Sequence, residues 1–222
     1  MKLKREEHTP VRIQSISELH RMLGLPKPLH PLVSLVDNTA INIERDKSLS
    51  GSYLFDFYKI SYKKTKTGRI GYGQGYYDFD EGGMVFTAPN QVIHVTDDEE
   101  YYGASLLFHP DFLRNHTLGH GIKRFGFFSY DTNEALFLSD KEKNIIFNVI
   151  ENIREELNTS IDDFSQDVMI AHLEVLLNYS NRFYKRQFIT RKAVNHDLLT
   201  HLEQVLETYF DQEESLKRGL PP

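Results

Sequence analysis

Hydrophobic positions along the chain follow two different periods, and the change falls near residue 138. Up to about residue 109, short apolar runs are separated by Gly and Pro turns, which is typical of antiparallel strands. The clearest case is the segment 82–94, in which Gly82-Gly83 and Pro89-Asn90 bound two short runs and the second run ends at His94. After residue 138, apolar residues recur at helical spacing. The pattern therefore predicts an α+β protein with a β-rich first half.

Within the first half, Ser15 and Glu18 have capping-box spacing and predict a short helix over 15–24. A strand is expected from Leu32 to Val36. Another strand is expected over 53–62, where residues alternate. Lys59, Ser61 and Lys63 favour solvent on the odd side of that strand, so the even side is expected to face the core. Its members are Leu54, Asp56, Tyr58, Ile60 and Tyr62.

Two aromatic residues do not fit this assignment. Phe55 and Phe57 fall on the odd side, where a helix or another subunit would have to cover them. Short strands at this spacing indicate a small antiparallel barrel or sandwich, and a small barrel can hold one ligand inside. This pattern therefore predicts a small barrel that senses or transforms a ligand.

The second half begins with Ser139 and Glu142, a further capping box, followed by apolar residues at helical spacing up to Leu157. After a polar break over 158–163, a longer helix is expected over 164–184. It carries two apolar rows, Val168-His172-Val175-Tyr179 and Met169-Leu173-Leu176-Ser180. So wide an apolar arc predicts cover on two sides, by the barrel and by a partner, unless the helix is simply buried in its own monomer.

A basic connector is expected over 182–192, and a further helix near Asn195, a plausible N-cap. The 222 residues include no Cys, which excludes disulfides and thiolate chemistry. The formal net charge of −6 argues against tight nucleic-acid binding by these residues. No secretory signal and no apolar run of about 18 residues is present, so a soluble cytoplasmic protein without membrane contact is expected.

The order of these parts resembles the AraC-type (arabinose-regulator-like) transcription regulators. The segments that carry the resemblance are Phe57-Tyr58-Lys59-Ile60, Gly83-Met84-Val85-Phe86-Thr87-Ala88-Pro89-Asn90-Gln91-Val92, Phe127-Phe128-Ser129-Tyr130, Asn133-Glu134-Ala135-Leu136 and Phe183-Tyr184-Lys185-Arg186-Gln187-Phe188. The resemblance implies a cupin-like sensor barrel over 1–137, dimerisation helices and a connector over 138–192, and the first helix of a DNA-binding domain over 193–222. The remainder of that domain would be missing, either through truncation or in a natural short form.

On this interpretation the protein is a homodimer that senses an unknown small-molecule effector and reaches DNA only through the missing domain. Four residues are candidates for anchoring the effector, because they are expected on one inward face: Asp56, Tyr58, Phe86 and His94. A packed core is the alternative for these positions. The candidate dimerisation residues lie on the long helix and are Val168, His172, Leu173, Leu176, Tyr179 and Phe183.

His94 falls where the second cupin motif places a metal-binding histidine, but the sequence has no His-x-His pair for the first motif. One histidine does not hold a catalytic metal, so no metal, cofactor or catalytic residue is predicted, and the protein is not expected to be an enzyme. Two alternatives stay open. One is a metal-dependent cupin enzyme, and the other is a dimerisation module whose barrel is filled by its own side chains.

Overall fold

The computed structural model describes residues 9–41, 50–63, 69–72, 75–78, 83–95, 103–128, 135–159 and 165–210. The chain divides into two compact units, Met1–Phe183 and Tyr184–Pro222. The first unit contains both helices and largely antiparallel sheets, which confirms the predicted α+β class. In the second unit, helix α4 (Ser165–Phe210) continues from Tyr184 to its end.

The strands of the first unit form three sheets. The largest has the order β10-β7-β4-β9-β2 with antiparallel neighbours. Its strands are β2 (Val33–Asp37), β4 (Tyr58–Lys63), β7 (Gly83–Thr87), β9 (Gly103–Phe108) and β10 (Leu136–Phe137). A second sheet has the order β1-β3-β8, from β1 (Val11–Ile13), β3 (Gly51–Phe55) and β8 (Val92–Val95). The third pairs β5 (Arg69–Tyr72) with β6 (Gly75–Asp78).

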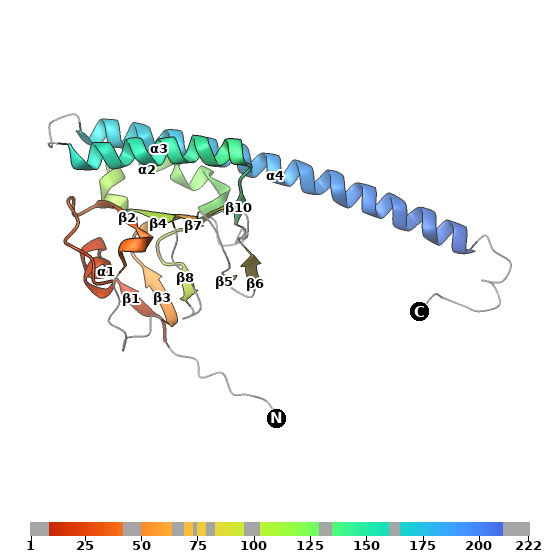
Figure 1. Cartoon of the computed structure of the whole chain (residues 1–222), viewed down its shortest axis with the longest axis horizontal. Helices are drawn as coiled ribbons and strands as arrows, with labels where there is room; N and C mark the ends of the chain where they lie inside the picture. Colours follow the sequence, from red (N-terminus) through yellow and green to blue (C-terminus); the bar gives the residue numbers. More distant parts are fainter. Residues whose placement is uncertain are drawn as a thin grey trace, which may run out of the picture. The chain divides into compact units, whose positions relative to one another are not determined.

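These sheets lie below α2 (Thr117–Gly121), α3 (Asp140–Asn158) and the first part of α4 in Figure 1 and do not join into one closed barrel over the described strands. Strands β7 and β8 flank the predicted turn at Pro89 and Asn90, and Asn90 adopts a positive φ of 63° there. The two strands belong to different sheets, so this turn carries the chain from one sheet to the other. The short strands of the sequence prediction are confirmed, while the closed barrel is not shown.

The predicted continuous strand over 53–62 is wrong. The chain bends at Asp56 and Phe57, and the strands on either side of the bend enter different sheets. The bend also changes which positions point inward. Before the bend the odd residues Tyr53 and Phe55 are buried; after it the even residues Ile60 and Tyr62 are buried. The expected core face is therefore wrong on β3. On β4 the even residues Ile60 and Tyr62 are buried as expected, but Ser61 on the expected solvent side is buried as well.

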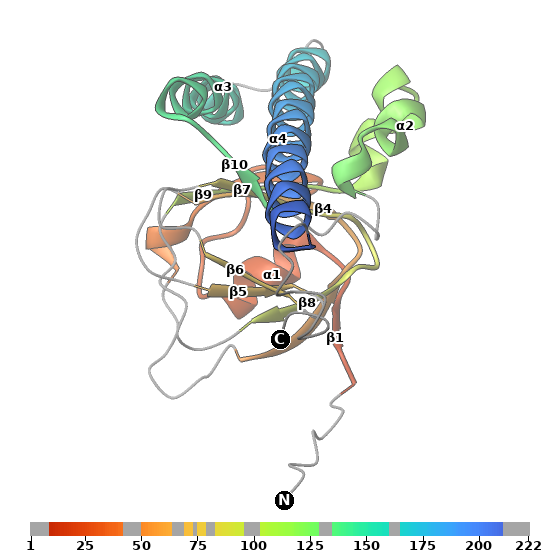
Figure 2. The same ribbon diagram turned by 90° about the vertical axis from the view of Figure 1, so that its right-hand side faces the viewer.

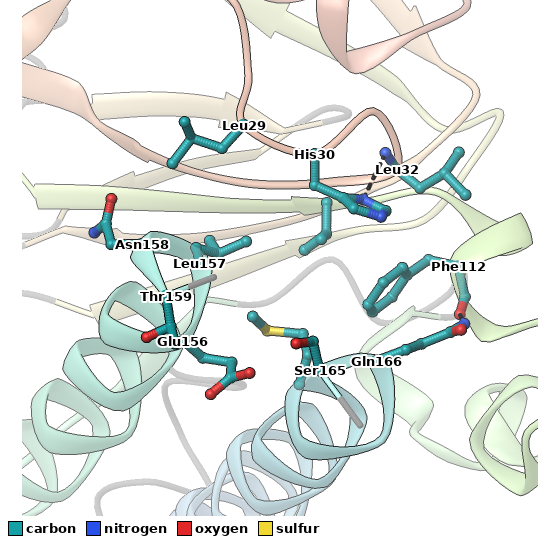
Figure 3. A pocket seen from close by; sticks show the side chains of 12 residues that line it. Leu29, His30, Leu32, Phe112, Glu156, Leu157, Asn158, Thr159, Ser165 and Gln166 are labelled. Carbon is teal, nitrogen blue, oxygen red and sulfur yellow. Dashed lines mark hydrogen bonds between the residues drawn. The ribbon is translucent and has the colours of Figure 1, made fainter. Parts of the chain in front are cut away.

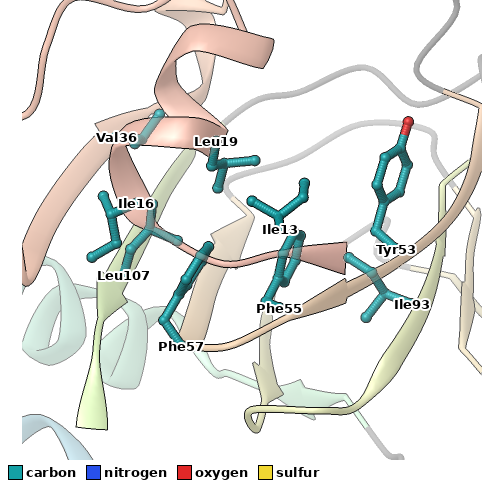
Figure 4. Close-up of a cluster of buried hydrophobic side chains, with 9 residues drawn as sticks. All are labelled: Ile13, Ile16, Leu19, Val36, Tyr53, Phe55, Phe57, Ile93 and Leu107. Atoms are coloured by element: carbon teal, nitrogen blue, oxygen red, sulfur yellow. The ribbon is translucent and has the colours of Figure 1, made fainter. Parts of the chain in front are cut away.

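Phe55 and Phe57 are buried under a helix. The sequence predicted that either a helix or another subunit would cover them, and the structure shows the first. Helix α1 (Ile16–Met22) begins after Ser15, whose Oγ accepts a hydrogen bond from Glu18 N over 3.1 Å. The two phenyl rings stack with their centroids 5.1 Å apart. They belong to a cluster of buried side chains that α1 completes (Figure 4), made up of Ile13, Ile16, Leu19, Val36, Tyr53, Phe55, Phe57, Ile93 and Leu107.

Helices α2 and α3 and the part of α4 up to Phe183 lie on the opposite side of the five-stranded sheet from α1 (Figures 1 and 2). Helix α3 (Asp140–Asn158) starts with the predicted capping box of Ser139 and Glu142. It buries Ile146, Val149, Ile150 and Ile153. The short helix α2 (Thr117–Gly121) is preceded by a 3-10 turn, η2 (Pro110–Leu113), and the 3-10 turns η3 (Ile122–Arg124) and η4 (Gly126–Phe128) follow.

Helix α4 is longer than expected. It runs without interruption from Ser165 to Phe210, so the predicted connector over 182–192 is helical and the predicted helix start at Asn195 is wrong. The physical reason is that residues 165–210 contain no Gly or Pro, and an asparagine alone does not end a helix. None of the described helices combines the length and the apolar character that spanning a membrane requires.

Candidate functional site

Two of the four predicted effector residues meet in a cluster of aromatic rings. Tyr58 of β4 stacks on Phe108 with a centroid distance of 5.0 Å, and Phe86 of β7 lies 4.1 Å from Phe127. Both contact Phe128 edge-on, at 4.9 Å from Tyr58 and 5.8 Å from Phe86. Burial raises the pKa of the Tyr58 phenol above its usual value. This cluster is a well-packed part of the core with one phenol at its margin.

The other two predicted effector residues lie elsewhere. His94 of β8 is exposed, and its Nδ1 is 2.8 Å from Ser52 Oγ on the neighbouring strand. The Asp56 carboxylate accepts a hydrogen bond from Arg12 Nε over 2.9 Å at the surface. The four residues therefore do not share one inward face, contrary to the prediction. The turn after β7 places His94 on β8 of the three-stranded sheet, and the bend places Asp56 directly after β3 in the same sheet.

The predicted dimerisation residues of α4 also fall into two groups. Leu173, Leu176 and Phe183 are at most 4% exposed within this single chain. They share their face with Met169, which is buried too, and Ser180, whose hydroxyl lies 3.8 Å from Met84 Sδ on β7. This row is used to hold α4 against the sheet, as expected for a helix buried in its own monomer.

The second row of α4 faces outward. Val168 and Val175 are 39% and 42% exposed. His172 and Tyr179 are half-buried, and the Tyr179 ring stacks on Phe183 at 5.8 Å. Phe147 on the neighbouring helix α3 is 43% exposed as well. Single exposed apolar side chains are common on protein surfaces, and they mark a contact surface where they form a contiguous patch.

A cleft that the sequence analysis did not anticipate lies at one end of the helix layer (Figure 3). Its volume is about 500 Å³. It forms where the segment before β2, the turn η2, the end of α3 and the start of α4 meet. The residues that line it are Leu29, His30, Leu32, Val33, Phe112, Glu156, Leu157, Asn158, Thr159, Ser165, Gln166 and Met169. We call this cleft the α3–α4 groove.

His30 occupies one wall of the α3–α4 groove. Its Nδ1 accepts a hydrogen bond from Leu32 N over 3.1 Å, which leaves the hydrogen of the neutral ring on Nε2. The ring packs edge-on against Phe112 at 5.4 Å. Burial lowers the pKa of His30 below its usual value, so the neutral form is favoured. His30 thus offers the groove a neutral N–H donor.

Three other polar side chains of the groove have partners within the chain. Gln166 Nε2 donates to the Phe112 carbonyl over 2.8 Å and thereby ties α4 to η2. At the end of α3, Asn158 Nδ2 donates to the Arg154 carbonyl over 2.8 Å, and Thr159 Oγ1 donates to the Glu155 carbonyl over 2.9 Å. Side-chain donors that satisfy the last carbonyls of a helix fix its end. Two side chains thus cap the end of α3 where it forms a wall of the groove.

A second cleft, of about 240 Å³, adjoins the first and shares Leu29, Val33, Leu157 and Asn158 with it. His20 forms part of its wall. His20 Nδ1 lies 2.6 Å from the Pro26 carbonyl, and because a carbonyl only accepts, Nδ1 carries the hydrogen. Nε2 is 3.0 Å from Ser34 Oγ. These contacts fasten the segment that leads into β2.

No group of three His, Asp or Glu side chains lies close enough to hold a metal ion in the part of the chain that the structure describes. A comparison of the sequence with models of known protein families and with curated proteins finds no match. The first unit carries two outward features, the exposed row of α4 and the α3–α4 groove.

Proposed function

We propose that this chain is the effector-sensing and dimerising portion of an AraC-type transcription regulator. It would act in the cytoplasm as a homodimer and reach DNA only through a domain outside these 222 residues. The observation that carries the proposal is the division of α4 into a buried row, which includes Leu173 and Leu176, and an exposed row, which includes Val168 and Val175. One helix thus packs on the sheets and presents an apolar surface to a partner.

The order of the elements supports the same function. Short strands come first, α3 and α4 follow, and the first half of α4 covers the five-stranded sheet. In the proposal the sheets are the cupin-like sensor. Helix α4 packs on β7 through Ser180 and Met84. A movement of the sheet would therefore shift the helix that carries the exposed row.

An effector can act in this way only by binding one arrangement of the dimer better than another. The cluster of rings around Tyr58 and Phe86 supports the alternative of a dimerisation module without a ligand, since aromatic side chains already occupy that part of the core. Both versions require self-association through α4, and they differ in whether a small molecule changes it.

The proposal is tested by fusing the chain to a DNA-binding domain that represses a reporter gene only as a dimer. We expect the fusion to repress, and Val175→Glu to relieve repression, because a charge in the exposed row must lose its hydration when the partner docks. Asn178→Glu is the matched control, since Asn178 is exposed and lies outside the row. Equal repression by all three fusions would contradict the proposal, as would a wild-type fusion that does not repress.

A further inference from the structure

We infer that the α3–α4 groove is a binding site for an organic cation with an apolar body, such as an arylalkyl amine. This site is separate from the predicted effector residues and does not depend on the proposed regulatory function. Its volume of about 500 Å³ lies in the range of small-molecule sites. Such sites combine apolar walls with a few polar groups that orient the ligand.

The charge of the groove selects a cation. Glu156 is the one acidic side chain among the described residues that line it, and these include no Lys or Arg. The nearby Arg154 is engaged by Glu151, with 3.2 Å between Nε and Oε1. His30 does not supply a positive charge, because its burial favours the neutral ring. An ammonium group is thus attracted at Glu156, whereas a carboxylate or phosphate is repelled.

The walls of the groove select the apolar body. Leu32, Val33, Phe112 and Met169 come from three separate segments and line the same groove. Val33, Phe112 and Met169 are each at most 3% exposed and form the base of the apolar wall, while Leu29, which is 68% exposed, provides a part of this wall that a ligand can reach. Glu156 and His30 stand on different sides of this wall, on α3 and on the segment before β2. A ligand with its ammonium at Glu156 can lay its apolar part on the wall and offer an acceptor to His30 Nε2.

The methionines provide a way to observe binding. The chain has 4 Met residues, of which Met169 lines the groove and Met84 lies under α4 beside Ser180. We would label the methionine methyl groups isotopically and titrate the full chain with three matched probes, phenylbutylamine, phenylbutanol and phenylbutyrate. We expect the amine to shift the Met169 resonance saturably, the alcohol to do so with about fivefold weaker affinity, and the acid to have no effect.

Two variants assign the preference to Glu156. Glu156→Gln is expected to lower the affinity for the amine about fivefold, to the level of the alcohol, and to leave binding of the alcohol unchanged. Glu155→Gln, an exposed neighbour that does not line the groove, should bind the amine as the wild type does. A wild-type Met84 resonance in each variant reports that the fold is intact.

Three results would overturn the inference. The first is an amine that does not shift Met169 at any concentration. The second is an acid that binds as tightly as the amine. The third is a preference for the amine that survives Glu156→Gln or is lost equally in Glu155→Gln. Because none of these readouts involves self-association, they are independent of the outcome for the exposed row of α4.

Discussion

The Ser180 hydroxyl of α4 lies 3.8 Å from Met84 Sδ of β7, and both side chains are fully buried. The hydroxyl has one hydrogen, and the shorter contact is to the Leu176 carbonyl one helical turn earlier, at 2.8 Å. The hydroxyl therefore donates its hydrogen bond within the helix, to the Leu176 carbonyl, and its contact with the sulfur is van der Waals packing. A small side chain at this position lets α4 approach the sheet.

Replacing Ser180 by a larger residue should separate the helix from the sheet. We expect Ser180→Leu to lower the free energy of unfolding by about 1–3 kcal/mol, the usual cost of overpacking a core. Ser180→Ala should cost at most about 1 kcal/mol, because it removes one local hydrogen bond and fits the same space. Urea unfolding of the three proteins measures both values. A Ser180→Leu protein as stable as the wild type would show that α4 does not pack on β7 in this way.

The bend between β3 and β4 can be tested through the cluster under α1. Phe57 is completely buried, and we expect Phe57→Ala to lower the free energy of unfolding by about 3–5 kcal/mol. Leu54 is only half-buried, so Leu54→Ala should cost less than about 2 kcal/mol. Thermal or urea unfolding gives the comparison. A continuous strand over 53–62 would reverse the order, with Leu54→Ala the more costly of the two.

His30 should make stability depend on pH. Burial lowers its pKa in the folded state, so between the folded and unfolded values the unfolded chain binds the proton more readily. The stabilising effect of the neutral ring is therefore full above the unfolded pKa of about 6.5 and is lost as pH falls through the lower folded value. We expect the free energy of unfolding to fall more steeply toward acid pH in the wild type than in His30→Asn. Parallel profiles for the two proteins would contradict this.

Charges placed on the buried row of α4 should act on folding instead of association. Leu173 is completely buried, and Leu173→Glu puts an unpaired carboxylate against the sheet. We expect this change to cost about 3 kcal/mol or more and to unfold much of the protein at ambient temperature. Circular dichroism during heating measures it. A cooperative unfolding transition at the wild-type temperature would place Leu173 on the surface, contrary to the structure.

The starts and the buried faces of the helices could be predicted well because their signals are local. Ser15 and Ser139 begin helices as their capping spacing indicates, and Ile146 and Ile150 are buried as the helical period requires. The sequence did not predict that α4 continues past Asn195. An asparagine can cap the start of a helix or lie inside one, and the residue itself does not show which of the two applies. Only the surrounding residues, which include neither Gly nor Pro over 165–210, distinguish the two cases.

The sites were less predictable because they depend on contacts between distant segments. Nothing in the alternation over 53–62 reveals the bend at Asp56, which separates Asp56 and His94 from Tyr58 and Phe86. The α3–α4 groove combines residues near 30, 112, 157 and 166, and no local pattern joins them. The polar break over 158–163 and the prolines before Leu32 were signals in the sequence, since such residues favour turns between packed elements.

The most direct test of the account is the mass of the protein in solution, measured by size-exclusion chromatography with light scattering over a range of concentrations. The wild type and Asn178→Glu should be dimers. The double variant Val168→Glu with Val175→Glu should be a monomer that unfolds at the wild-type temperature, because both valines are exposed within the single chain. A monomeric wild type at every concentration, or a double variant that remains a dimer, would contradict the assignment of the exposed row of α4 as the interface.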